Sequence, residues 1–188
     1  MKKVSISEIQ NALNPEIVRS FQIIYIGIMA GATFFLCVIL FMYLTGSPGE
    51  EISMHSLETV NLLTLMHLIS FAAGMVVSKY LYNRSLSEPA VESAINDMKA
   101  DAVSNIAGHY ISIIRTAKII RLALIEGPAF FGLVTCFLAV NNKIIYQYGY
   151  YWINIFSYIV FIYIVIKDFP TREKLLEIFK NKLKYLIE

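Results

Sequence analysis

Four long apolar runs, separated by short charged segments, dominate the pattern of the chain. They cover residues 21–44, 60–78, 122–140 and 146–166. Each run is long enough to cross about 30 Å of hydrocarbon as an α-helix. Backbone groups in lipid must be satisfied within the segment, which favours helices over irregular chain. The pattern therefore predicts an all-α membrane protein with four transmembrane helices.

Two of these runs resemble each other. Residues 21–46 and 117–142 align without a gap, at a constant offset of 96. Seven pairs are identical: Ile23 and Ile119, Ile24 and Ile120, Gly31 and Gly127, Phe34 and Phe130, Phe35 and Phe131, Val38 and Val134, and Phe41 and Phe137. We interpret the chain as two tandem helical hairpins with the same orientation in the membrane. Coincidence between two helices rich in Ile and Phe is the alternative.

Small residues mark one face of both aligned helices. Gly27 and Gly31 align with Ala123 and Gly127, so each helix has a small-xxx-small pattern that lets two backbones approach closely. Pro128 follows directly and leaves one carbonyl of the preceding turn without its helical donor. We therefore expect these five residues to serve helix packing, with a kink near the proline.

The other residues form arms and connections of one integral membrane domain. We divide the chain into a cytoplasmic arm (1–20), a first hairpin (21–82), a cytoplasmic helical connection (83–116), a second hairpin (117–168) and a basic amphipathic tail (169–188). Within the arm, the segment from Ser5 to Leu13 predicts a short helix. Asn14 and Pro15 then have the residue types that begin the next helix.

The connection and the tail both carry apolar residues at helical spacing. In the connection these predict one long helix that enters the third span, and they are Val91, Ile95, Met98, Ala102, Ile106, Tyr110 and Ile113. The tail begins at Pro170 and Thr171 and combines apolar residues with lysines, as helices on anionic leaflets do. Packing against the chain's own termini is the alternative for the connection, and docking to a protein is the alternative for the tail.

The basic residues indicate the orientation. Of the 16 Lys and Arg residues, 15 lie in or next to the arm, the connection and the tail. The loop after the first run holds Glu50, Glu51 and Glu58 without a basic residue, and the loop after the third run holds only Lys143. The positive-inside rule therefore places both termini in the cytoplasm. The lipid bilayer, with its anionic inner leaflet, is the expected surrounding of the chain.

Composition narrows the function classes. Of the 188 residues, 57% are hydrophobic and 16% are charged, against about 25% charged residues in soluble domains. A net charge of +2 argues against nucleic-acid binding. The two cysteines form no CxxC pair, and the sequence motifs of the common soluble enzymes are absent. We expect no catalytic residue, no metal and no cofactor.

Glu126 is the one formally charged residue within the four apolar runs. A carboxylate in hydrocarbon costs at least about 2.5 to 3.5 kcal/mol and usually faces a bundle interior or a cavity. Glu126 is therefore a possible ion or proton site. The structural alternative is a protonated carboxyl group, or one that bonds the backbone, Tyr25, Ser70 or Tyr158, with Arg121 partly neutralising its charge.

His67 is the second residue of this possible ion or proton site. By the helical rise it lies about 10 Å below the outer surface, and Glu126 lies a similar distance from the inner surface, so we expect no contact between them. A neighbour such as Asn154 would satisfy the ring inside the bundle. A proton relay through the imidazole is the alternative.

Two stretches of the sequence resemble known families. Residues 119–134, IIRLALIEGPAFFGLV, and residues 169–174, FPTREK, resemble a family of small, uncharacterised bacterial inner-membrane proteins. This resemblance covers most of the chain and implies no activity. Glu126 followed by Phe131-Gly132-Leu133-Val134 is also similar to the proteolipid ring subunits of rotary ATPases. In contrast to those subunits, a glycine-repeat helix is missing here, and Glu126 lies on the first helix of its hairpin rather than the second.

These observations favour a function without catalysis. We expect a multi-pass accessory, scaffold or assembly protein of the bacterial inner membrane, with another membrane protein or a second copy of the chain as its partner. The competing hypothesis is a proton- or cation-coupled translocation element that uses Glu126.

Overall fold

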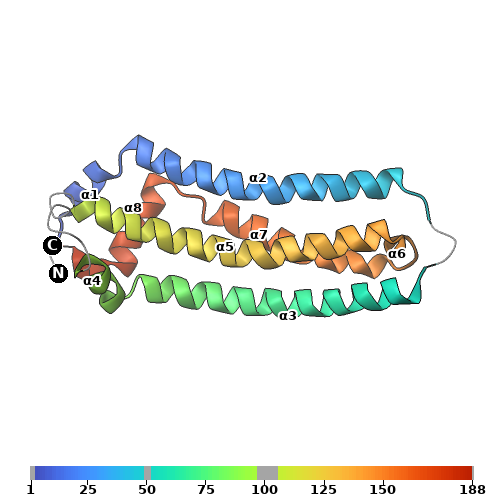
Figure 1. Cartoon of the computed structure of the whole chain (residues 1–188). Helices are drawn as coiled ribbons and strands as arrows, with labels where there is room; N and C mark the ends of the chain where they lie inside the picture. The colour runs from blue at the N-terminus through green and yellow to red at the C-terminus, as the bar shows by residue number, and fades with distance from the viewer. Residues whose placement is uncertain (1–2, 49–51, 97–105, 188) are drawn as a thin grey trace. The chain divides into compact units, whose positions relative to one another are not determined.

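The chain is helical through most of the residues that the computed structural model describes, which are residues 3–48, 52–96 and 106–187. The helices, labelled in Figure 1, are α1 (Ile6–Ala12), α2 (Pro15–Thr45), α3 (Met54–Ser85), α4 (Glu88–Asn96), α5 (Ile106–Asn141), α6 (Ile144–Gln147), the 3₁₀ helix η2 (Gly149–Ile155), α7 (Phe156–Lys167), α8 (Arg172–Lys182) and the 3₁₀ helix η3 (Lys184–Leu186). Four segments are long and apolar enough to cross a membrane: α2, α3, α5 and Gly149–Lys167. The prediction of four membrane-spanning helices is confirmed at this level.

Local side chains fix where three of the helices begin. Ser5 and Glu8 form a reciprocal capping box at the start of α1. The Asn14 side chain accepts a hydrogen bond of 2.9 Å from the Ile17 backbone N–H at the start of α2. The Thr171 hydroxyl accepts one of 3.3 Å from Lys174 N–H at the start of α8. These starts were predicted because capping depends on neighbours in the sequence.

The fourth span differs from the regular helix that its apolar run predicts. Its first seven residues form η2, and an α-helix begins only at Phe156. Side chains supplement the backbone bonds of this segment, since the Tyr151 carbonyl accepts from Asn154 Nδ2 at 3.0 Å and from Cys136 Sγ at 3.6 Å. In hydrocarbon such partners are needed wherever the regular helical pattern is lost.

The chain divides into two compact units. The terminal unit comprises Met1–Tyr25, Ser78–Leu122 and Asp168–Glu188, and the span unit comprises Ile26–Val77 and Ala123–Lys167. Both units therefore combine segments from both predicted hairpins. The hairpin arrangement itself stays a prediction.

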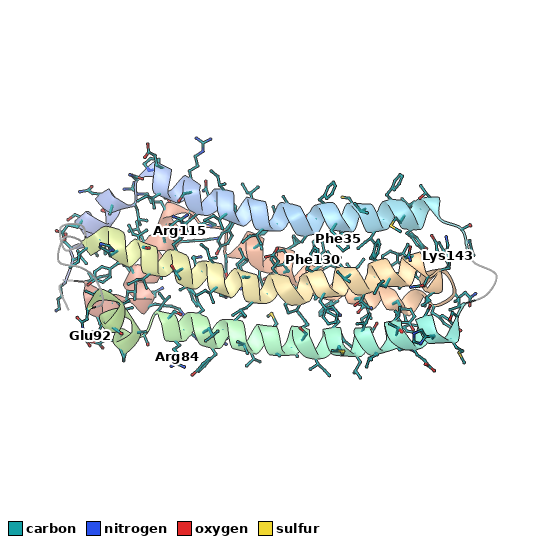
Figure 2. The ribbon with its side chains drawn as sticks, in the orientation of Figure 1. Phe35, Arg84, Glu92, Arg115, Phe130 and Lys143 are labelled. Atoms are coloured by element: carbon teal, nitrogen blue, oxygen red, sulfur yellow. The ribbon has the colours of Figure 1, made fainter. Side chains whose placement is uncertain are left out.

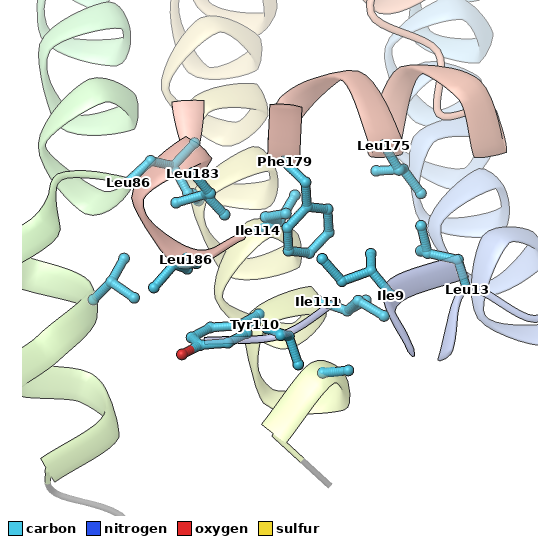
Figure 3. Packing of buried hydrophobic residues seen from close by; sticks show 14 of the residues in the cluster. Ile9, Leu13, Leu86, Tyr110, Ile111, Ile114, Leu175, Phe179, Leu183 and Leu186 are labelled. Atoms are coloured by element: carbon cyan, nitrogen blue, oxygen red, sulfur yellow. The ribbon is translucent and has the colours of Figure 1, made fainter. Parts of the chain in front are cut away.

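A buried apolar cluster forms the core of the terminal unit. Figure 3 shows side chains from α1, α5, α8 and η3 packed against one another. Ile9, Tyr110, Phe179 and Leu186 are each at most 1% exposed. The two ends of the chain also meet here, because Val4 N–H donates to the Leu186 carbonyl at 2.9 Å. The termini are thus joined within one unit.

The apolar residues of α8 are used inside this cluster. Leu175 and Phe179 are each 1% exposed, and burying such a side chain contributes about 1.5 to 3 kcal/mol. These side chains are therefore unavailable for insertion into a leaflet, and contact of the lysine side with lipid stays a proposal. In the connection, Val91 is likewise fully buried. Met98 and Ala102 of the predicted stripe, together with Lys99, Glu50 and Glu51, lie outside the described residues.

The span unit is held by aromatic contacts between its helices. Phe35 of α2 stacks on Phe130 of α5 with ring centroids 5.0 Å apart. Figure 2 labels both residues between the two helices. Tyr43 and Tyr146 stack at the same distance. Large apolar side chains are also exposed along the spanning helices, among them Phe34 at 73% and Leu44 at 78%. Exposed side chains of this kind fit an environment of hydrocarbon rather than water.

Candidate functional site in the membrane-spanning helices

A buried polar network connects α3 with η2 and α7 around His67. The imidazole Nδ1 lies 2.9 Å from Asn154 Oδ1, and Nε2 lies 2.8 Å from Ser157 Oγ. All three side chains are fully buried. The Asn154 amide is oriented by the Tyr151 carbonyl, which can only accept and receives Nδ2, so Oδ1 faces the ring and Nδ1 carries a proton. Asn154 is thus the neighbour of His67 that the sequence led us to expect.

The network can accommodate a second proton on the ring. The Ser157 hydroxyl has two acceptors within reach, His67 Nε2 at 2.8 Å and the Asn154 carbonyl at 3.4 Å. If Nε2 gains a proton, it donates to Ser157 Oγ, and the hydroxyl turns toward the carbonyl. The hydrogen bonds of the site are therefore satisfied in either state, which is what a proton-carrying residue needs.

Further hydrogen bonds extend the network along η2. Asn154 Nδ2 donates to Thr64 Oγ1 at 3.0 Å, and Tyr151 OH donates to Asn61 Oδ1 at 2.6 Å. Tyr150 OH donates to Tyr151 OH at 3.1 Å. Asn61, Thr64 and His67 are spaced three residues apart, so they share one face of α3. That spacing is the sequence signal by which this polar face could have been found.

Gly132 of α5 closes the third side of the site. A Cβ placed there would collide with the Asn154 carbonyl and would lie 2.7 Å from His67 Nε2 and 2.8 Å from Ser157 Oγ. Real Cβ atoms do not approach neighbours this closely, so the site requires a residue without a side chain. Sequence reasoning used Gly132 only in a family resemblance and missed this role.

Glu126 stands apart from this network. Its side chain is partly buried, and no hydrogen bond or ion pair joins its carboxylate to another described residue. Two of the residues considered from the sequence are engaged elsewhere: the Tyr158 hydroxyl pairs with Thr33 at 2.8 Å, and Arg121 pairs with Asp168 at 2.6 Å. No described contact links Glu126 to His67, as expected.

The predicted packing residues fall into two groups. Gly27, Gly31 and Gly127 are exposed, and a Cβ at any of them would meet nothing within 4 Å. Ala123 is also exposed, whereas Pro128 is buried. Most of the small residues expected to pack therefore lie open within the described chain, and only the proline makes a close contact.

That contact joins Pro128 to Gly74 of α3. A Cβ at Gly74 would lie 2.8 Å from the Pro128 ring and 2.9 Å from the Leu124 carbonyl oxygen. Gly74 therefore lets α3 approach α5 where the proline removes a helical hydrogen bond, and α5 continues through Pro128 as a helix. The run Ala72-Ala73-Gly74 is the sequence signal for this approach.

A groove of about 340 Å³ lies along the same pair of helices. Its lining is mostly small and apolar and consists of Ser70, Ala73, Gly74 and Val77 from α3 with Ala123, Leu124, Gly127 and Pro128 from α5. Two of the predicted small residues thus line a concave surface. We call it the small-residue groove.

Comparison of the chain with family models, with curated proteins and with solved structures gave no match. The family resemblances read from the sequence accordingly stay expectations. The fold and the site themselves define the class: an all-helical chain with four helices able to cross a membrane, a buried polar network and an open groove of small residues.

Proposed function

We propose that this protein is a multi-pass accessory or assembly protein of the bacterial inner membrane that acts without catalysis. It holds one transmembrane helix of a partner protein in the small-residue groove. The observation that carries this proposal is the groove itself, with exposed small residues from α3 and α5.

The physics of helix packing in lipid supports a helical occupant. Lipid tails are as apolar as leucine, so helices associate through close van der Waals contact, and small residues allow the backbones to approach. The groove is lined mainly by apolar atoms, and five of its eight lining residues are Gly, Ala or Ser. Its walls are held by the Gly74 contact with Pro128, which fixes the shape that a partner helix would meet.

Site-specific photocrosslinking tests this proposal. A photoreactive residue at Ala73, which lines the groove, should capture one partner membrane protein in native membranes. The matched control is the neighbouring Ala72, which is equally an exposed alanine but does not line the groove. Capture of the same protein from both positions, or of lipid alone, would contradict the proposal.

A bulky substitution gives an independent readout. Ala73→Phe fills the groove and should prevent co-purification of the protein captured at that position, whereas Ala72→Phe should leave it intact. A crosslinked product with twice the mass of the chain would identify a second copy as the occupant and would overturn a role in holding another protein. Under this proposal Glu126→Gln leaves the partnership unchanged.

The second candidate function is proton- or cation-coupled translocation through Glu126. It is favoured by a carboxylate without a partner among the described residues, beside groove residue Gly127. The two protonation states that the His67 network can accommodate also support it. Unpartnered carboxylates within membranes are commonly functional.

A hydrophobic carbodiimide distinguishes the two candidates. If Glu126 carries ions, the reagent should label it in a manner that depends on pH, and Glu126→Gln should abolish transport in reconstituted vesicles. If the reagent does not label wild-type Glu126 at any pH, this function is contradicted. The groove proposal is tested separately by its own crosslink.

A further inference from the structure

Cationic side chains gather around Tyr82 in the terminal unit. We call Lys79, Lys118, Arg121 and Lys182, with the acidic Asp168, the Tyr82 cluster. The Arg121 guanidinium carbon lies 5.2 Å from the centroid of the Tyr82 ring, and Lys182 Nζ lies 4.7 Å from it. The two cations are therefore at most about 10 Å apart and repel each other.

Lys118 adds a buried charge to this cluster. The residue is only 6% exposed. Its ammonium donates to Tyr25 OH at 3.5 Å and to the Asp168 carbonyl at 3.3 Å, both longer than a typical hydrogen bond. An ammonium has three N–H donors, so these two long contacts satisfy the buried cation only weakly.

Arg121 likewise has unused donor capacity. It pairs with Asp168 at 2.6 Å through one terminal nitrogen. Its Nε is buried without a hydrogen-bond partner, although buried donors are almost always paired. Asp168 thus pairs with Arg121 through its carboxylate and accepts from Lys118 through its backbone carbonyl. Its single negative charge does not balance the four cations of the cluster, so a positive excess remains around Tyr82.

The cluster is partly exposed to solvent, and its like charges lie close enough to repel one another. The Arg121 and Asp168 side chains are 30% and 27% exposed, and Lys79 and Lys182 are exposed. Burial, followed by the charges of Arg121 and Lys79, lowers the pKa of Lys182. An anion placed beside these groups would offset their mutual repulsion.

The sequence positions of these residues correspond to a membrane surface. Lys79 follows the second apolar run directly, Arg121 precedes the third, and Asp168 comes two residues after the fourth. Lipid phosphates lie at that level, and basic pockets at the ends of transmembrane helices bind anionic headgroups.

We propose that the Tyr82 cluster binds the phosphate group of an anionic membrane phospholipid. The guanidinium of Arg121 and the ammonium of Lys182 contact the phosphate, and Lys118 and Lys79 add charge behind it. A guanidinium suits phosphate because its fork of donors matches two oxygens. This site is independent of the small-residue groove.

Native mass spectrometry of the full chain in a neutral detergent tests the site. With phosphatidylglycerol and phosphatidylcholine at equal mole fraction, the wild type should retain phosphatidylglycerol preferentially. Lys79→Gln with Lys182→Gln should reduce that preference by about twenty-five-fold, at roughly fivefold per lysine. Both lysines are exposed, so the pair should fold normally.

The matched control removes the same amount of charge from the same unit. Lys180→Gln with Lys184→Gln changes two exposed lysines outside the cluster and should keep the preference. If the control loses the preference for phosphatidylglycerol to the same extent, the effect comes from net charge alone and the proposed site is wrong. Arg121→Lys keeps the charge but loses the fork, so it should weaken retention while the unfolding transition stays in place.

Inorganic phosphate distinguishes the two sources of the ligand group. Millimolar phosphate should not displace phosphatidylglycerol from the wild type, because a lipid is also held by its acyl chains. Displacement by free phosphate would assign the cluster to a soluble anion and overturn the lipid assignment. Equal retention of both lipids by the wild type would overturn the proposal altogether.

Discussion

Single residues decide how closely the helices of the span unit approach. Gly132 allows α5 to touch the His67 network, and Gly74 allows α3 to touch the Pro128 ring. Both contacts place a backbone where any side chain would collide. Because the polar groups beside Gly132 are buried inside the span unit, moving them apart would leave donors and acceptors unpaired, which is costly.

Gly132→Ala should therefore destabilise the protein. The added methyl group meets the Asn154 carbonyl and the His67 ring, and overpacking of this kind costs about 1 to 3 kcal/mol. The measurement is the unfolding transition in mixed detergent micelles of rising dodecyl sulfate content.

Gly127→Ala is the control on the same helix. Nothing lies within 4 Å of its Cβ position, so the isolated chain should tolerate the change and gain about 0.5 to 1 kcal/mol from the better helix former. Equal transitions for the two variants would show that the packing at Gly132 is looser than described.

The residues of the site differ in how far the sequence could reveal them. Asn154 was expected beside His67 because both depths follow from the apolar runs. Gly132 and the pairing of Arg121 with Asp168 could not be predicted, since they depend on which helix faces meet. Helix starts at Ser5 and Asn14 were predictable because caps use local contacts.

At the scale of elements, the tail helix α8 belongs to the terminal core. Phe179 and Leu175 are buried against residues of other segments in the cluster, and the Tyr185 hydroxyl donates to the Leu86 carbonyl at 3.1 Å. Burial raises the pKa of Tyr185 to about 12. The sequence predicted the helix from its caps and spacing, but spacing alone could not show what covers its apolar side.

Phe179→Ala should release α8. Truncation of a buried phenylalanine costs about 3 to 5 kcal/mol, so the tail should become sensitive to limited proteolysis in a neutral detergent. Lys180→Ala, which changes the exposed neighbour on the same helix, should leave the tail protected. A wild-type tail that is cut rapidly without anionic lipid would indicate that lipid, rather than the core, holds it.

At the scale of the whole molecule, the long helices α2, α3 and α5 each contribute one end to the terminal unit and the rest to the span unit. The described residues nearest both termini also belong to the terminal unit. This pairing predicts that both ends of the chain lie on the same side of the membrane, and the distribution of basic residues predicts the cytoplasmic side.

Labelling with an impermeable maleimide checks that orientation. Met54 is the first residue of α3, in the segment expected outside, and is 74% exposed, so Met54→Cys should react in intact cells. Lys3→Cys and Lys184→Cys should react only after permeabilisation. The unmodified chain, whose Cys37 and Cys136 lie in spanning helices, provides the background. Reaction of Lys3→Cys and Lys184→Cys from opposite sides would contradict the joined termini.

The hydrogen bond between Val4 and Leu186 can form only after the C-terminal segment has been synthesised. The two residues are 182 positions apart, and ribosomes add about 5 to 20 residues per second, so Val4 waits roughly 9 to 36 s for its partner. Throughout that interval Ile9 and Leu13 lack the part of their cluster that α8 and η3 contribute. A chain that stalls before the tail is made consequently exposes apolar side chains to proteases and chaperones, so incomplete chains can be distinguished from complete ones.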